Sequence, residues 1–113
     1  MYLRTKKLQE FYLEYKKTAP YEALHKEPSI REWQYWRLIN NRFPYNKLAS
    51  AHALVVLKRD CSIFHLTEDE LNELWGVILT WADRIYDTSI VNFSSVRSVN
   101  HTPHVHLITY LDN

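Results

Sequence analysis

Histidines are the residues of this chain whose spacing points most clearly to chemistry. Three of the six, His101, His104 and His106, fall within six consecutive positions, and His52 lies upstream. Side chains two apart in a β-strand share a face, so a strand turns His104 and His106 to one side and Val105 to the core side. Two imidazoles on an otherwise apolar strand cost free energy to bury unless they are hydrogen-bonded or functional.

Three interpretations of this H-x-H pair are open on the residues alone. Both rings can be surface-facing strand histidines with ordinary hydrogen bonds. The pair also supplies two neutral nitrogens for zinc, with His52 as the other obvious ligand and only distant carboxylates beyond it. Finally, imidazole is basic near neutral pH and can attack phosphorus or carbon as a nucleophile.

Strands that could position the histidines are visible in the sequence. Residues 33–43 are rich in aromatic and β-branched side chains and end at Pro44, and residues 51–58 form a second apolar run. The PYNKLAS segment between them suits a reversal, so the two predict an antiparallel hairpin. Residues 90–93 and 104–111 predict two further strands.

The clearest predicted helix covers residues 67–86. Thr67 and Glu70 form a capping box, with two more acids in the first turn. One apolar stripe follows: Leu71, Leu74, Trp75, Ile78, Ala82 and Ile85. Residues 2–17 predict an amphipathic helix with Leu8, Phe11, Tyr12 and Tyr15 on one face.

These elements predict a single α+β domain over residues 1–113. We expect a mainly antiparallel sheet of about four to five strands with a long central helix in residues 33–111, and a helical extension in residues 1–30. Apolar residues make up 46% of the chain and aromatic residues 14%, which is ample for a packed core.

Composition excludes several function classes. The net charge of +1 provides no overall field for nucleic acid or an anionic membrane. The single cysteine, Cys61, cannot form an internal disulfide, and no apolar run has membrane-span or signal-peptide character, so we expect a reduced, cytoplasmic protein. The single glycine, Gly76, excludes a glycine-rich phosphate loop.

Three stretches carry a resemblance to a known family. They are NNRFPYNKLASAHALVVLKR at 40–59, LTEDELNEL at 66–74 and VNFSSVRSVNHTPHVHLITY at 91–110. In order and spacing, residues 35–110 resemble the histidine triad (HIT) superfamily of nucleotide hydrolases and transferases. The resemblance covers about two-thirds of the chain and implies a HIT-like fold.

The family motif has three histidines alternating with apolar residues and a closing apolar pair. His106 followed by two apolar residues matches its end, which makes His104 the middle histidine and puts Thr102 in the place of the first. A second register makes His104 the first and His106 the middle histidine, with Ile108 as the third. We prefer the first register because it retains the closing apolar pair.

The resemblance implies catalytic roles for three histidines. His104 attacks the α-phosphorus to form a nucleotidyl-histidine, His106 donates to phosphate oxygens, and His52 lies beside them. The family places a backbone carbonyl against Nδ1–H of the nucleophile, and we expect the carbonyl of His106 in that role. Because Thr102 cannot carry charge, we expect weakened or altered catalysis.

Substrate-binding residues are implied in the same way. Asn92 and Ser98 match family positions at the ribose or phosphate, and Arg97 is a side-chain donor in a loop that lacks the family's glycines. Phe43 and Tyr45 lie where the family holds its nucleoside. Our further candidates are Thr102 and Lys58 as phosphate contacts.

The resemblance implies a nucleotide hydrolase or nucleotidyltransferase acting on a phosphoramidate, a dinucleoside polyphosphate or a related phosphoanhydride. No cofactor is required, although a divalent metal can accompany a polyphosphate substrate, and members commonly pair into homodimers. Two alternatives stay open. One is a catalytically weak nucleotide-binding or interaction protein, and the other is a metal-binding protein that uses His52, His104 and His106.

Overall fold

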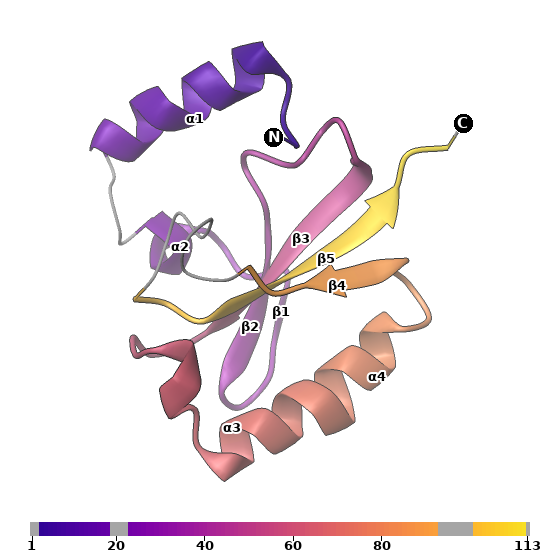
Figure 1. Ribbon diagram of the computed structural model, residues 1–113. Coiled ribbons are helices and arrows are strands. Elements are labelled where there is room, and N and C mark those ends of the chain that lie inside the picture. The colour runs from indigo at the N-terminus through magenta and orange to yellow at the C-terminus, as the bar shows by residue number, and fades with distance from the viewer. Residues whose placement is uncertain (1–2, 19–22, 93–100, 113) are drawn as a thin grey trace.

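The computed structural model describes residues 3–18, 23–92 and 101–112, which build an α+β fold around one antiparallel sheet (Figure 1). In this part of the chain five strands lie in the order β1-β2-β3-β5-β4. The strands are β1 (Arg31–Glu32), β2 (Trp36–Asn40), β3 (Ala49–Leu57), β4 (Thr88–Ile90) and β5 (His104–Tyr110). The helical segments are α1 (Lys6–Thr18), α2 (Ala23–Lys26), η1 (Ile63–His65), α3 (Glu68–Glu73), η2 (Leu74–Ile78) and α4 (Leu79–Ala82). The predicted α+β class and antiparallel sheet are confirmed.

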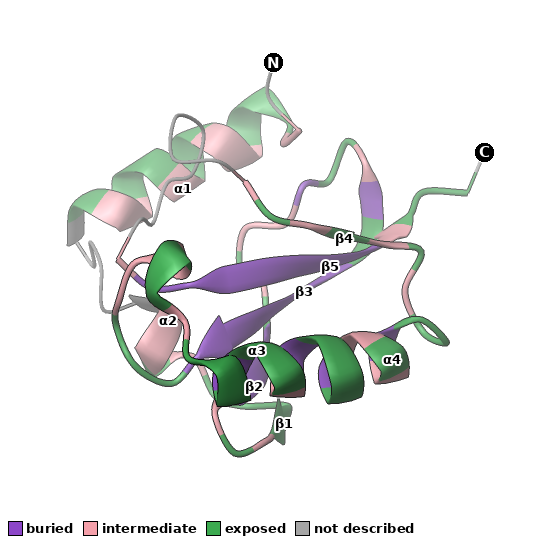
Figure 2. Ribbon diagram, turned by 60° about the horizontal axis from the view of Figure 1, so that its bottom comes forward, coloured by how far each residue is buried: buried purple, intermediate pink, exposed green. Residues whose placement is uncertain are grey.

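The two faces of the sheet are covered by different parts of the chain. Helices α3 and α4 lie on one side and α1 on the other (Figure 1), and the central strands β3 and β5 are buried (Figure 2). Val105 and Leu107 join the core under the helices. By strand alternation His104 and His106 belong to the opposite face, as the sequence predicts.

The central helix begins as predicted and ends earlier. Thr67 accepts a hydrogen bond from the backbone N–H of Glu70, and the Glu70 carboxylate accepts from the N–H of Thr67, so the capping box is present. The last helical residue is Ala82 instead of residue 86. Its carbonyl accepts from the N–H groups of both Ile85 and Tyr86, which closes the winding before the chain turns into β4.

The predicted apolar stripe on this helix is only partly correct. Leu74 and Ile78 are buried in the core, whereas Leu71, Trp75 and Ile85 are exposed, Trp75 by 67%. Ile85 lies beyond the last helical residue, Ala82. Trp75 lies in the π-helical segment η2, in which the N–H of Leu79 bonds to the carbonyl of Leu74. This wider turn changes the angular spacing that the prediction assumed to be constant.

Two predicted strands have different bounds in the structure. Residues 33–43 do not form one strand, because Trp33–Tyr35 reverses the chain between β1 and β2 and Trp33 N–H bonds to the Trp36 carbonyl. The Glu73 carboxylate accepts hydrogen bonds from backbone N–H groups of residues 34–36 and so replaces ladder partners there. The strand predicted at 90–93 is β4, which begins two residues earlier. The predicted antiparallel hairpin of β2 and β3 is confirmed.

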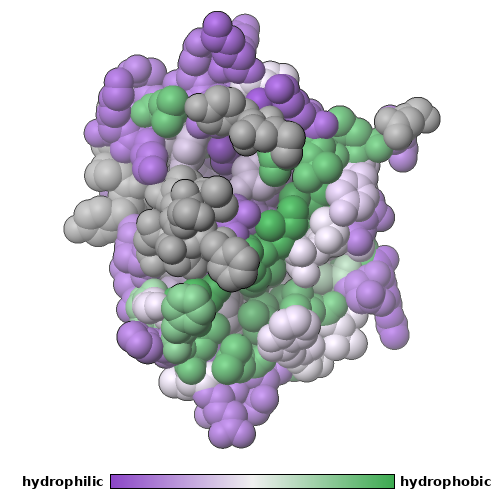
Figure 3. Space-filling model, in the orientation of Figure 1, coloured by the Kyte–Doolittle hydropathy of each residue, from purple (hydrophilic) through white to green (hydrophobic). Residues whose placement is uncertain are grey.

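The N-terminal segment packs onto the histidine-bearing side of the fold. The rings of Tyr12 and Tyr15 in α1 lie 5.3 and 5.1 Å from the ring of Phe43. Arg37 of β2 is buried and donates to the backbone carbonyls of Leu24 and Glu27 around α2. Hydrophilic residues cover much of α1, whereas a hydrophobic band crosses the strands below it (Figure 3). None of the described helices is long and apolar enough to cross a bilayer.

Candidate functional site

Strands β3 and β5 bring three histidines into one buried cluster, which we call the histidine cluster: His52, His104 and His106. In the antiparallel register His52 faces Ile108 and Leu54 faces His106, so His52 and His106 are diagonal neighbours on one face. His52 Nε2 lies 2.8 Å from His106 Nδ1, and the ring centres of His104 and His106 are 5.3 Å apart.

Hydrogen bonds assign the protons of two of these rings. The backbone N–H of Tyr45 donates to His52 Nδ1 over 3.0 Å, so neutral His52 carries its proton on Nε2. That proton is donated to His106 Nδ1, which places the His106 proton on Nε2. The Asn92 atom nearest His106 Nε2, at 3.4 Å, is the amide nitrogen, which donates to the Tyr45 hydroxyl and cannot accept the His106 proton. His106 therefore presents an N–H donor at this end of the cluster.

His104 has the opposite proton arrangement. Its Nδ1 lies 2.8 Å from the carbonyl oxygen of Thr102, which can only accept. The proton of neutral His104 is therefore on Nδ1 and the lone pair on Nε2. The prediction that the carbonyl of His106 is the acceptor is wrong, because the ring bonds to the residue two positions earlier, just before β5 begins.

Thr102 is held by groups at the end of β3. Its side chain is 1% exposed and its hydroxyl donates to Asp60 Oδ1 over 2.7 Å. The same carboxylate oxygen lies 2.6 Å from His25 Nε2 of α2. A hydroxyl has a single proton to donate, so the Thr102 proton is committed to Asp60 in this structure.

Burial keeps two members of the cluster neutral at physiological pH. Desolvation lowers the pKa of His52 to about 4, and the positive charge of Arg4 and that of the protonated form of His104 act in the same direction. Desolvation also lowers the pKa of His106 well below its usual value, with contributions from His104, His52 and Arg4. Arg4 is the permanent cation that acts on both rings, and no carboxylate of the described residues is among the groups that shift their pKa values.

Arg4 is one of the residues near this cluster that the sequence prediction missed. Its guanidinium carbon lies 4.3 Å from the ring centre of Tyr12 and 4.9 Å from that of Tyr45, and its Nε donates to the Phe43 carbonyl over 2.7 Å. Within the described part of the chain Arg4 forms no ion pair with a carboxylate, and burial lowers its pKa. No local pattern marks Arg4, because Phe43 and Tyr45, which bring it to the cluster, lie about forty positions away.

Two predicted substrate-binding residues lie against the cluster. The Tyr45 ring stacks on His106 with a centroid distance of 5.1 Å and an interplanar angle of 22°. The Asn92 amide donates to the Tyr45 hydroxyl over 2.9 Å. Asn41, which was not predicted, adds its amide 3.3 Å from both nitrogens of His52.

Other predicted substrate residues have different surroundings. The Phe43 ring packs against α1, and the Lys58 ammonium donates to the carbonyl of Trp33 over 2.5 Å. Arg97 and Ser98 lie outside the described residues. Their roles, and that of Thr102, stay predictions.

The described residues contain no group of three or more His, Cys, Asp or Glu side chains arranged to hold a metal ion. In the histidine cluster, His52 and His106 direct ring nitrogens at each other, so those atoms are hydrogen-bond partners and do not converge on a common point. The interpretation of His52, His104 and His106 as a metal centre therefore has no support in this geometry.

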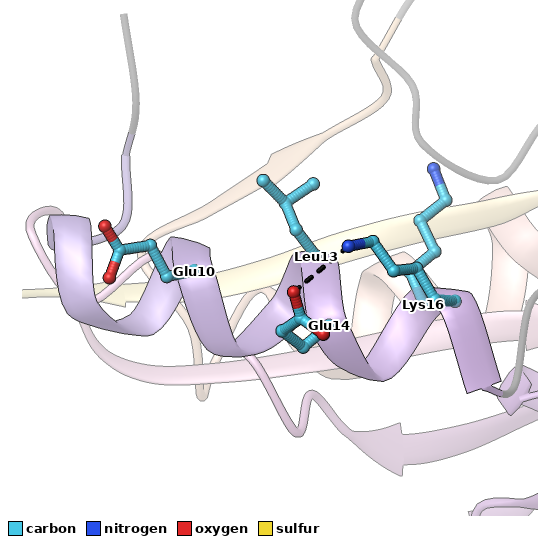
Figure 4. Close-up of a pocket in the computed structure, with 5 residues that line it drawn as sticks. Glu10, Leu13, Glu14 and Lys16 are labelled. Atoms are coloured by element: carbon cyan, nitrogen blue, oxygen red, sulfur yellow. Dashed lines mark hydrogen bonds and ion pairs between the residues drawn. The ribbon is translucent and has the colours of Figure 1, made fainter.

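A hollow of about 690 Å³ lies elsewhere, on α1 (Figure 4). Glu10, Leu13, Glu14, Lys16 and Lys17 line it, and Glu14 pairs with Lys17 over 3.1 Å. These residues lie mostly on the side of α1 opposite Tyr12 and Tyr15. Among the described residues, the lining of this hollow comes from one helix and includes no member of the histidine cluster.

Comparisons with protein-family models, with curated proteins and with solved structures give no match.

Proposed function

We propose that this protein is a nucleotide hydrolase or nucleotidyltransferase that acts at the α-phosphate of a phosphoramidate, a dinucleoside polyphosphate or a related phosphoanhydride. The observation that carries the proposal is the hydrogen bond from His104 Nδ1 to the Thr102 carbonyl. It leaves the lone pair on Nε2, the arrangement that a nucleophilic imidazole needs. A relationship to the histidine triad superfamily, with a HIT-like sheet, is part of the same proposal.

The proposed reaction has two displacements. His104 Nε2 attacks the α-phosphorus, the new N–P bond forms, and the bond from phosphorus to the leaving group breaks with its electron pair on the leaving group. The imidazole becomes cationic, and its Nδ1–H to the Thr102 carbonyl stabilises that charge. Water, or another acceptor, then attacks the phosphorus and loses a proton while the N–P electron pair returns to His104.

The surroundings of the cluster favour an anionic substrate. His106 Nε2–H is a donor for a non-bridging phosphate oxygen, where negative charge develops during the displacement. Arg4 supplies a half-buried positive charge near His52 and His106, without a carboxylate partner among the described residues. A bound phosphate would neutralise this charge.

A second candidate function rests on Thr102. The family has a histidine at this position, whereas the Thr102 hydroxyl donates to Asp60. Loss of one donor favours a protein that binds nucleotides at the histidine cluster and turns them over slowly or not at all.

The test is chromatographic detection of released AMP and GMP from an adenosine phosphoramidate, a dinucleoside polyphosphate and a nucleotide sugar. Wild type is compared with His104→Ala and with His65→Ala, which removes an exposed histidine outside the cluster. We expect release by wild type and His65→Ala but not by His104→Ala. No release, with nucleotides still raising the melting temperature, supports the binding protein. If no nucleotide is released and nucleotides do not shift the melting temperature, both candidate functions are contradicted.

A further inference from the structure

The segment before β5 is pinned by the end of β3 and the turn after it. Three successive carbonyls accept hydrogen bonds: that of His101 from Cys61 N–H over 2.9 Å, that of Thr102 from His104 Nδ1, and that of Pro103 from Leu57 N–H over 3.0 Å. The direction of the middle carbonyl therefore decides which tautomer of His104 is stabilised.

The side chain of Thr102 is fixed separately from its backbone. Asp60 Oδ1 accepts its hydroxyl proton over 2.7 Å and also lies 2.6 Å from His25 Nε2. Asp60 is thus the point at which α2, the turn after β3 and the start of β5 meet. Its side chain is about half exposed, and its carboxylate hydrogen-bonds to Thr102 and His25, neither of which belongs to the histidine cluster.

We propose that Asp60 is a positioning residue that acts through Thr102 to hold His104 in the Nδ1–H tautomer. The role of this tautomer as a nucleophile rests on the proposed function, whereas the tautomer itself does not. The inference extends the site to a residue for which the histidine triad resemblance provides no motif position. It also gives Thr102 a role that does not require contact with substrate.

The experiment is a long-range ¹H–¹⁵N correlation spectrum of the imidazole rings in the ¹⁵N-labelled full chain, recorded without substrate. Wild type should show His104 with a protonated Nδ1. Because a single hydrogen bond contributes on the order of 1 kcal/mol, Asp60→Ala should raise the ratio of the Nε2–H to the Nδ1–H form about fivefold. Thr102→Val should act in the same direction.

Conservative variants separate positioning from general disruption. Thr102→Ser keeps the hydroxyl and Asp60→Asn keeps an acceptor oxygen, so both should retain the wild-type spectrum. A wild-type tautomer ratio in folded Asp60→Ala overturns the proposal, because the hydrogen bonds from Cys61 and Leu57 would then be enough to hold the Thr102 carbonyl in place. Asp60 is half exposed, so we expect Asp60→Ala to fold and to test the proposal even if Thr102→Val does not fold.

Activity distinguishes this inference from the proposed function. If wild type releases nucleotide, kcat should fall in Asp60→Ala with little change in KM and recover in Asp60→Asn. If wild type turns over no nucleotide while Asp60→Ala still shifts the tautomer ratio, the proposed function fails and the positioning role stands. If wild type releases nucleotide but Asp60→Ala leaves the tautomer ratio unchanged, the positioning role fails and the proposed function stands.

Discussion

Lowering the pH from 6.5 toward 4 should reduce the free energy of unfolding of this protein, because His52 is buried as a neutral ring. The pKa of His52 is lowered from 6.5 to about 4. Between these values the unfolded chain binds a proton that the folded chain does not, so stability falls as pH falls from 6.5 toward 4. Above pH 6.5 the ring is mostly neutral in both the folded and the unfolded chain, so acid no longer reduces the free energy of unfolding through His52.

The size of the effect follows from the two pKa values. At pH 5 the ring is almost fully protonated in the unfolded chain and about one-tenth protonated in the folded chain. Linkage then gives a loss of about 2 kcal/mol between pH 7 and pH 5 from His52. His106 adds a loss of the same sign, since burial lowers its pKa too.

Urea unfolding followed by tryptophan fluorescence at pH 7 and pH 5, at constant ionic strength, measures this loss. His52→Gln removes the titrating ring, so its loss between the two pH values should be smaller than that of wild type by about 2 kcal/mol, whatever its stability at pH 7. His65→Gln controls for the removal of a histidine outside the cluster. Equal stability of wild type at both pH values, or the same loss in His52→Gln, would refute the reasoning.

Three further predictions test other parts of the structure. Arg59 donates two hydrogen bonds to Glu70 and lowers its pKa from 4.5 to about 2, so Glu70→Gln should remove stability that is present above pH 4.5 and lost toward pH 2. Because Arg59 is 46% exposed, solvent screens this ion pair, and we expect Glu70→Gln to lose about 1–2 kcal/mol of unfolding free energy. Urea unfolding at pH 7 and pH 3 measures this loss, with exposed Glu68→Gln as control. Gly76→Ala should stabilise the chain by about 0.5–1 kcal/mol in thermal unfolding, because an added Cβ meets no atom within 4 Å and the residue is helical. Arg4→Gln should weaken nucleotide binding about tenfold in calorimetric titration, as expected for loss of a charge-assisted contact, whereas exposed Lys7→Gln should not; equal affinities would exclude Arg4 from the site.

Local signals predicted the parts of the fold that depend on neighbours in sequence. The capping box of Thr67 and Glu70 and the alternation of His104, Val105 and His106 both follow from spacing of a few residues. The exposure of Trp75 did not follow, because the π-helical turn is invisible to a constant 3.6-residue period.

The candidate site was only partly predictable for a related reason. The pairing of β3 with β5 brings His52 to His106, and the family resemblance had already put these residues together. Arg4 and Asp60 reach the site through contacts with residues about forty positions away, and single residues of these types carry no pattern. Both become visible only when the chain is folded.

Mass spectrometry of the protein during turnover tests most directly whether His104 is the nucleophile, as we propose. A nucleotide phosphoramidate is mixed with excess enzyme and quenched in alkaline denaturant, which preserves a phosphorus–nitrogen bond to histidine. We predict one nucleotidyl group on the peptide that contains His104, at His104, and none in His104→Ala. Turnover that persists in His104→Ala, or a nucleotidyl group on another residue, would contradict the account.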